Sequence, residues 1–222
     1  MTPWQITLLI IIQTLLSLVL FAAAIAILVF LLRKPMRSFK YMDLVVFDKL
    51  DRQVTPSRNR IMLFVTSLGK HQFLIPANLL LIGYFLFIER QNWFSIRIAT
   101  IALSSLVLML VLKSLFRRKR PLAPLLKAVK GLSFPSGHAI MAVTFYGLLI
   151  YIVSHEIAID WLRIGIYSLL LVLIIGIGFS RIYLRVHYAS DVLAGFIIGL
   201  LWLLISLVVL DGVEEYVKRE IQ

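Results

Sequence analysis

The sequence has 222 residues, of which 61% are hydrophobic, and it contains no cysteine. An average soluble domain is about 45–50% apolar, so this composition indicates a protein that crosses a membrane several times. The lack of cysteine excludes disulfides, a thiolate nucleophile and cysteine-ligated zinc, while the net charge of +12 favours an anionic partner, either membrane headgroups or a substrate.

Six apolar runs are long enough to cross a bilayer as helices. They cover residues 6–32, 71–88, 95–116, 137–154, 161–180 and 189–210. Residues 33–70 are charged but carry interspersed apolar side chains, which is typical of an amphipathic helix lying in the membrane interface. A turn at Pro56 follows, and the short segment "IMLFVTSLG" leads into the second span. We therefore predict an all-α polytopic membrane protein with six transmembrane helices and an interfacial amphipathic segment, forming one domain over residues 1–222.

An even number of spans puts both termini on one side of the membrane and the loops 33–70, 117–136 and 181–188 on the other. The loop side carries 18 of the 23 lysines and arginines. By the positive-inside rule this charge count predicts that the loop side is cytoplasmic.

The first loop-side motif is "KSLFRRKRP", in which Lys113 is followed after six residues by Arg120 and a proline. An ammonium and a fork-shaped guanidinium suit the several oxygens of a phosphate. The alternative is that these cations only snorkel to the membrane surface. We adopt that alternative for Arg117, Arg118 and Lys119 and leave them out of the site.

The second motif is "PSGH", residues 135–138. Proline suits the first turn of a helix, Ser136 suits the N-cap, and Gly137 allows a close approach of the backbone to a ligand. Free N–H groups at such a helix start bind anions, with His138 at the rim. The alternative is an ordinary helix start with a solvated histidine.

The third motif is "SRIYLRVHYASD", which contains Arg181, His187 and Asp191. The last two are four residues apart, so on a helix they share one face. A carboxylate there can bond one imidazole nitrogen and leave the other free as a base or nucleophile. The alternative is an interfacial pair that only orients the helix.

Together the three motifs supply anion-binding cations, a helix start, two histidines and a carboxylate on one side of the membrane. A metal-dependent phosphatase needs a cluster of carboxylates. The loop side offers few of them outside the amphipathic segment, and Asp191 is the one within the motifs. We therefore predict phosphoryl transfer through a histidine, with no metal or other cofactor.

The three motifs resemble, position for position, the signature of the type 2 phosphatidic acid phosphatase (PAP2) superfamily. That signature is K-x6-R-P, P-S-G-H and S-R-x5-H-x3-D, and it is complete and in order between residues 113 and 191. The six-span layout is also similar to the membrane branch of the family. The superfamily's vanadium haloperoxidases are soluble, so the composition argues against them.

The resemblance implies a role for each residue of the motifs. His187 would attack phosphorus and form a phosphohistidine, Asp191 would hold His187 in the attacking tautomer, and His138 would protonate the leaving oxygen. The phosphoryl oxygens would be bound by Lys113, Arg120, Ser136, Gly137 and Arg181.

The resemblance also implies a lipid phosphate as substrate, membrane lipids as surroundings and no nucleic acid. Small bacterial members of the family act on several lipid phosphates, of which undecaprenyl diphosphate and phosphatidylglycerophosphate are the expected ones here. The family places the active site on the extracytoplasmic face of the cell membrane. We follow it against the charge count, because phosphate-binding cations bias that count. The alternatives are a lipid A phosphatase or phosphotransferase of the same superfamily, and a non-catalytic protein that binds or transports anionic lipids.

Overall fold

The structure is a computed structural model that describes residues 40–121, 125 and 131–221. Nearly all of these residues belong to one unit, Met42–Gln222. The described residues form helices and no strand, as the composition predicts. The elements are α3 (Lys40–Asp51), α4 (Pro56–Ser67), α5 (His71–Gly83), the π-helical η1 (Tyr84–Ile88), α6 (Asn92–Phe116), α7 (Gly137–Glu156), α8 (Asp160–Tyr183) and α9 (Ala189–Ile221).

Five described segments are long and apolar enough to cross a membrane. They are Pro56–Ile88, Asn92–Phe116, Gly137–Glu156, Asp160–Tyr183 and Ala189–Arg219. Four of them begin within three residues of a predicted span. Their outer faces expose large apolar side chains, as a helix surrounded by lipid does. The predicted span 6–32, and residues 33–39 of the amphipathic segment, lie outside the described residues.

The second span begins earlier than predicted, whereas the turn at Pro56 and the segment that leads from it into the span are as predicted. Thr55 caps α4 by accepting a hydrogen bond from the Arg58 N–H, and Pro56 occupies the first turn. The apolar residues 61–65 of α4 then continue into α5, so the candidate span begins at Pro56 rather than at residue 71. Of the predicted amphipathic segment, α3 is the described helix that lies outside the candidate spans.

Helix α7 lies at the centre of the bundle and packs against α6, α8 and α9. Its contact with α9 is close because Gly195 and Gly199 face it. A Cβ at Gly195 would stand 2.9 Å from the Ser136 carbonyl oxygen, and one at Gly199 would stand 3.0 Å from that of Ile140. Glycines four residues apart let two helix backbones approach closely. The start of α7 is thereby held against the first turns of α9.

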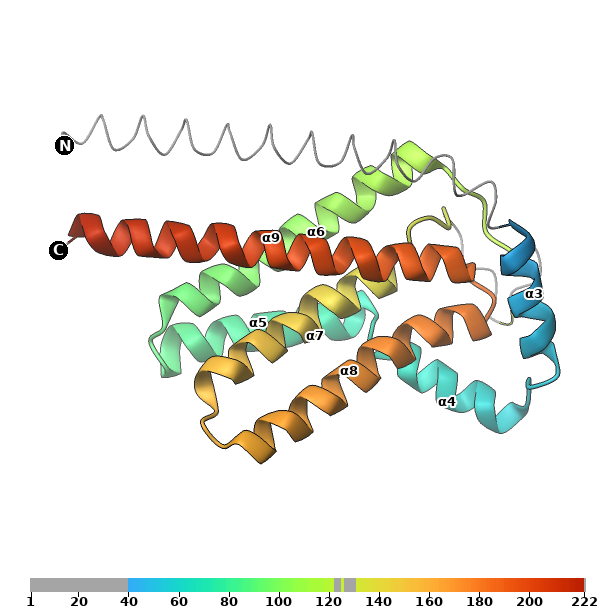
Figure 1. The fold of residues 1–222 in the computed structure, drawn as a ribbon, viewed down its shortest axis with the longest axis horizontal. Coiled ribbons are helices and arrows are strands. Elements are labelled where there is room, and N and C mark those ends of the chain that lie inside the picture. The colour runs from blue at the N-terminus through green and yellow to red at the C-terminus, as the bar shows by residue number, and fades with distance from the viewer. Residues whose placement is uncertain (1–39, 122–124, 126–130, 222) are drawn as a thin grey trace. The chain divides into compact units, whose positions relative to one another are not determined.

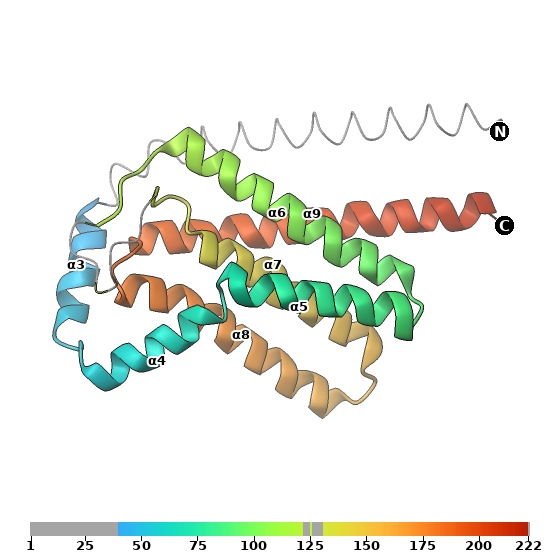
Figure 2. The ribbon, with the colours of Figure 1, turned by 180° about the vertical axis from the view of Figure 1, so that it is seen from behind.

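The three motifs meet at one end of this bundle, which we call the motif end. There α6 and α8 end and α7 and α9 begin, and both views show α3 beside these termini (Figures 1 and 2). The opposite end holds the start of α6, the end of α7 and the charged C-terminal turns of α9. The topology thus brings residues 113–121, 131–138 and 180–191 together, as the six-span layout predicts.

Candidate active site

The paired histidine and carboxylate of the third motif are buried where α8 gives way to α9. His187 is 1% exposed, and its backbone N–H donates to the Arg181 carbonyl (3.2 Å). Asp191 is fully buried in the first turn of α9, where its Oδ2 accepts the Tyr188 N–H (2.9 Å). An acidic side chain at this position closes a helix start, which explains why the turn forms here.

The His187 ring lies between a carboxylate and a cation. Its Nδ1 is 3.7 Å from Asp191 Oδ2, which is close but beyond hydrogen-bonding distance. Its Nε2 is 3.4 Å from Arg120 Nη1. Because a guanidinium has only donors, Nε2 must be the acceptor in that contact, so the proton of a neutral ring lies on Nδ1, facing Asp191. The lone pair of Nε2 points toward the cations.

Burial also controls the charge of His187. Desolvation lowers the pKa of its imidazole to about 4, helped by the positive charges of Arg120 and Arg181 and opposed by Asp191. His187 is therefore neutral at physiological pH. A neutral imidazole has the free lone pair that a nucleophile or base needs.

The cations of the first motif are fixed by backbone carbonyls of neighbouring loops. Lys113 Nζ donates to the Leu132 carbonyl (2.9 Å). Arg120 Nη1 donates to the Val186 carbonyl (2.9 Å) and its Nε to that of Gly131 (3.2 Å). Burial lowers the pKa of Arg120 from its ordinary value, with Asp191 acting in the opposite direction. Lys113 has three donors and Arg120 has five, so both keep donors for a ligand.

Ser136 occupies the N-cap of α7, as predicted, but its side chain makes no capping bond. Its backbone N–H donates to the Asp191 carbonyl (3.1 Å), which joins the starts of α7 and α9. A Cβ at Gly137 would stand 2.4 Å from Met109 Sδ, so this glycine also makes room for side-chain packing against α6. Sequence reasoning assigned the glycine only to ligand approach.

Arg181 is bound by the end of α4, and His138 lies beside the break between α4 and α5. Arg181 is 3% exposed, and its Nη1 donates to Thr66 Oγ1 (2.7 Å) at the end of α4. In the break itself, a Cβ at Gly69 would stand 3.2 Å from the His138 ring, so glycine leaves room for the imidazole there. No pattern in the sequence singles out Thr66 or Gly69.

Five buried side-chain atoms in the described residues have no hydrogen-bond partner, and four of them belong to the predicted site. They are Ser136 Oγ, His138 Nε2, Arg181 Nε and His187 Nδ1, with Tyr216 Oη as the fifth. Buried polar atoms are normally paired, so a cluster of unpaired ones needs an explanation. A bound oxyanion would accept hydrogen bonds from Ser136 Oγ, Arg181 Nε and a protonated His138 Nε2, and so would give these three donors a shared partner.

The structure corrects the interpretation of Arg118, which we left out of the site as a snorkelling residue. Arg118 binds Asp191 directly (Nη1 to Oδ1, 2.6 Å). Ser133 Oγ also donates to Asp191, in a short contact, and sequence reasoning missed it. Arg117 and Lys119 are exposed, as expected.

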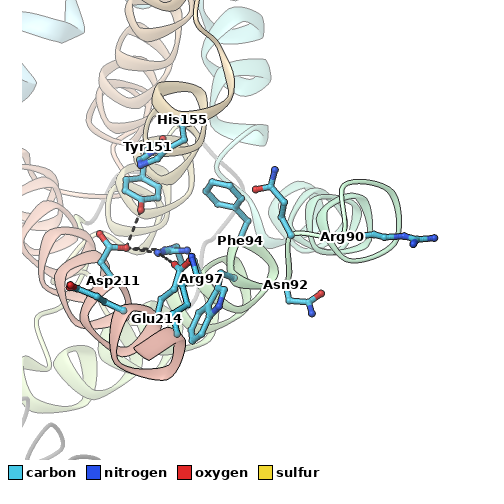
Figure 3. A pocket seen from close by; sticks show the side chains of 12 residues that line it. Arg90, Asn92, Phe94, Arg97, Tyr151, His155, Asp211 and Glu214 are labelled. Atoms are coloured by element: carbon cyan, nitrogen blue, oxygen red, sulfur yellow. Dashed lines mark hydrogen bonds and ion pairs between the residues drawn. The ribbon is translucent and has the colours of Figure 1, made fainter. Parts of the chain in front are cut away.

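A second polar site lies at the opposite end of the bundle and involves neither motif histidine. It is a cleft of about 680 Å³, in which the buried Arg97 donates to Asp211 (2.6 Å) and to Glu214 (2.5 Å). Figure 3 shows these side chains. Tyr151 Oη also donates to Asp211 (3.0 Å), and the Arg97 guanidinium lies 5.7 Å from the Tyr151 ring centroid. We call these four residues the Arg97 cluster. Its charges are paired with one another, which indicates a structural link between α6, α7 and α9.

Comparison with known proteins supports the resemblance seen in the motifs. The model of the PAP2 superfamily matches residues 94–213. Phosphatidylglycerophosphatase B of Bacillus subtilis (strain 168) is 34% identical over 166 residues, which cover 74% of this chain and 79% of that protein.

Two solved structures are similar in fold. A transmembrane PAP2-type phosphatidylglycerolphosphate phosphatase from Bacillus subtilis has a TM-score of 0.71 at 30% identity, with 92% of this chain and 97% of that chain covered. LpxE of Aquifex aeolicus has a TM-score of 0.60 at 29% identity, with 74% and 93% covered.

Proposed function

Because this chain belongs to the PAP2 superfamily and is a membrane phosphatase, we propose that its substrate is phosphatidylglycerophosphate. The Bacillus subtilis relative and the Bacillus subtilis crystal structure, both named for that substrate, support this choice. The observation that carries it is the set of cations near His187 at the end of the membrane-spanning helices, of which Arg181 is buried and Lys113 and Arg120 are half-buried. A phosphate head reaches this set while its acyl chains stay beside apolar helix faces.

In the proposed reaction, His187 Nε2 attacks the phosphorus of the terminal phosphate, and the bond from phosphorus to the glycerol oxygen breaks. His138 gives its proton to that oxygen, so the first step yields phosphatidylglycerol and a phosphohistidine. Water then attacks phosphorus while His138 takes a proton from it. The N–P bond breaks, inorganic phosphate leaves and His187 is restored.

The geometry around His187 supports these roles. The ring is neutral, its Nε2 faces the cations, and the protonated Nδ1 faces Asp191. Negative charge beside Nδ1–H stabilises the positive charge that the ring acquires when Nε2 attacks. In the proposed reaction, the 3.7 Å separation closes to a hydrogen bond when the substrate is bound.

The phosphoryl oxygens are bound, in this proposal, by the donors that the protein leaves unused. Lys113 and Arg120 each keep free N–H groups, and the Nε of Arg181 has no partner among the described residues. Ser136 Oγ and the N-terminal N–H groups of α7 complete the cradle. Such preset donors stabilise charge in a phosphoryl-transfer transition state without reorganisation.

The reaction as proposed needs no metal ion. Within the described ranges, no group of three or more histidine, aspartate or glutamate side chains is arranged to hold one. The three cations take the place that divalent ions have in many phosphoryl-transfer enzymes.

The test is release of inorganic phosphate by the purified protein in detergent with excess EDTA. Phosphatidylglycerophosphate, undecaprenyl diphosphate and phosphatidic acid are offered at equal concentration, with His187→Ala as the blank. We expect metal-free release that is lost in the blank and fastest with phosphatidylglycerophosphate. A different best lipid overturns the substrate, EDTA inhibition overturns metal independence, and no release from any lipid overturns the proposed function.

We place the motif end on the extracytoplasmic face of the cell membrane. The sequence contains no cysteine, so single cysteines can be labelled with an impermeant maleimide in intact cells. Lys119→Cys reports the motif end and Asp160→Cys the opposite end, since both positions are exposed. We expect Lys119→Cys to be labelled without permeabilisation and Asp160→Cys only after it. The reverse labelling pattern would show that the motif end is cytoplasmic, as the charge count predicts.

A further inference from the structure

Arg118 stands between two buried carboxylates from different parts of the chain. Its Nη1 donates to Asp191 Oδ1 (2.6 Å) and its Nη2 to Asp43 Oδ2 (2.8 Å). Its guanidinium also lies 4.1 Å from the centre of the Tyr188 ring. We call Asp43, Arg118 and Asp191 the Arg118 bridge. It connects α3 with the start of α9.

Asp43 is buried although it belongs to the interfacial helix α3. It is 1% exposed, whereas its neighbours Met42 and Leu44 are 60% and 50% exposed. Its Oδ1 accepts the Ser190 N–H (3.0 Å), and its Oδ2 accepts the Ser190 hydroxyl (2.7 Å). A buried carboxylate is costly unless it is paired in this way. Asp43 therefore fixes both the guanidinium of Arg118 and the first turn of α9.

The bridge determines how the Asp191 carboxylate is turned. Its Oδ2 is held by the Tyr188 N–H and the Ser133 hydroxyl, and its Oδ1 by Arg118. With both oxygens fixed, Oδ2 stays on the side of His187 Nδ1. Loss of Arg118 leaves Oδ1 without its charged partner, so the carboxylate stays beside the ring but is no longer held in one orientation.

We infer that Arg118 and Asp43 are positioning residues of the phosphatase reaction, which set the orientation of Asp191 and thereby that of His187. This inference rests on the proposed function of His187. Neither residue touches the reacting atoms, so both act through Asp191. Their loss lowers kcat, while KM changes little because the cations that bind phosphate are retained.

A positioning role of Arg118 should shift the pH dependence of the reaction, which a merely structural role would not do. The groups that face His187 are Arg120 from the loop after α6, His138 from α7, Arg181 from α8 and Asp191 from α9. Replacing Arg118 by glutamine removes a positive charge beside Asp191, which raises the pKa of His187. The acidic limb of kcat/KM therefore moves to higher pH. A variant that only folds less well keeps its limb in place.

The experiment compares Arg118→Gln with Arg117→Gln in the full-length protein, using phosphatidylglycerophosphate with EDTA. Arg117 is the matched control, because it is adjacent and exposed and bonds only a backbone carbonyl of its own helix. We expect kcat of Arg118→Gln to fall about 10–100-fold, as for other partners that orient a reactive side chain. Its KM should stay within about threefold. Arg117→Gln should match wild type.

Two further variants keep the inference testable if Arg118→Gln folds poorly. Asp43→Asn retains Arg118 but weakens its hold, so kcat should fall about threefold to tenfold. Arg118→Lys keeps the positive charge but not the forked guanidinium that bridges the two carboxylates. Its acidic limb should therefore lie close to that of the wild type, while its kcat should remain lowered. In the double variant Asp43→Asn/Arg118→Gln, the fall in kcat should be smaller than the product of the two single falls, since the two residues act as one unit.

The outcomes separate this inference from the proposed function. If the wild type and Arg117→Gln release no phosphate, the proposed function is wrong and the inference falls with it. If they are active and Arg118→Gln equals them, the inference alone is overturned. A loss of kcat in Arg118→Gln with an unmoved acidic limb also overturns it, because the role of Arg118 is then structural.

Discussion

The two ends of the helical bundle each hold an arginine between two carboxylates, and the two clusters do different work. In the Arg97 cluster at the opposite end, every charge is paired and one carboxylate, Asp211, is 47% exposed on its side chain. The two carboxylates of the Arg118 bridge at the motif end are more deeply buried, and the bridge lies at the same end as four buried side-chain atoms without partners. The same residue types thus make a closed structural link at one end and support an open site at the other. What distinguishes them is the unsatisfied hydrogen-bonding capacity nearby.

The largest effect should come from Arg120, the cation that contacts His187 Nε2. We expect Arg120→Ala to lower kcat/KM about 10²–10³-fold, because it removes donors to the phosphoryl group in the transition state. The measurement is phosphate release from phosphatidylglycerophosphate, with the exposed neighbour Lys119→Ala as control. Equal activity of the two variants would remove Arg120 from the site.

The comparison between the two ends is tested by changing Arg97. Arg97→Gln leaves Glu214 and Asp211 without their main partner, which should destabilise the protein by about 1–3 kcal/mol because these carboxylates are only partly buried. The thermal midpoint in detergent should fall while kcat per folded molecule stays within about twofold. A loss of kcat as large as that of Arg118→Gln would mean that the Arg97 cluster serves the reaction.

The close contact between α7 and α9 is tested by changing a glycine of α9, with a smaller expected effect on activity than that of Arg120→Ala. A methyl group at Gly195 meets the Ser136 carbonyl at 2.9 Å, and backbone cannot yield as a flexible side chain does. We expect Gly195→Ala to lower kcat about tenfold, since it displaces the start of α7 from His187. Gly212→Ala on the same helix has open space and should stabilise the protein by about 0.5–1 kcal/mol. Identical behaviour of the two variants would contradict the close packing.

The smallest expected effect is the change in folding stability with pH that the titration of His187 causes. Its pKa of about 4 lies below the ordinary 6.5 of histidine, because burial and the nearby arginines disfavour the imidazolium. The unfolded chain therefore binds this proton at higher pH than the native protein, so stability is full above about pH 6.5 and falls as the pH drops toward 4. An imidazole NMR signal that is missing in His187→Ala should titrate near pH 4. A midpoint near 6.5 would contradict the buried, cation-flanked ring.

Much of the fold follows from patterns that the sequence displays. Hydropathy located the starts of four of the five described spans, and the six-span layout indicated that Lys113, Ser136 and His187 would meet at one end. Hydropathy also ended the last span at residue 210, although α9 continues to Ile221. Pairs four residues apart, such as Glu214 with Lys218, sustain the helix beyond its apolar part.

The Arg118 bridge was beyond sequence reasoning for a physical reason. Arg117 takes a left-handed conformation (φ 47°) that ends α6 and turns the chain, and Arg118 follows this turn into the protein. Nothing in three adjacent basic residues shows which of them turns inward. The partner Asp43 is 75 residues away, and only its spacing of four from the buried Phe47 places it on the inner face of α3.

The most direct test of the account is whether His187 carries the phosphoryl group during turnover. The purified protein is mixed with phosphatidylglycerophosphate labelled in its terminal phosphate, quenched in alkali during steady state and mapped by mass spectrometry. We predict an alkali-stable, acid-labile phosphoryl group on His187, and neither label nor phosphate release in His187→Ala. Label on another residue, or phosphate release by His187→Ala at the wild-type rate, would contradict the account.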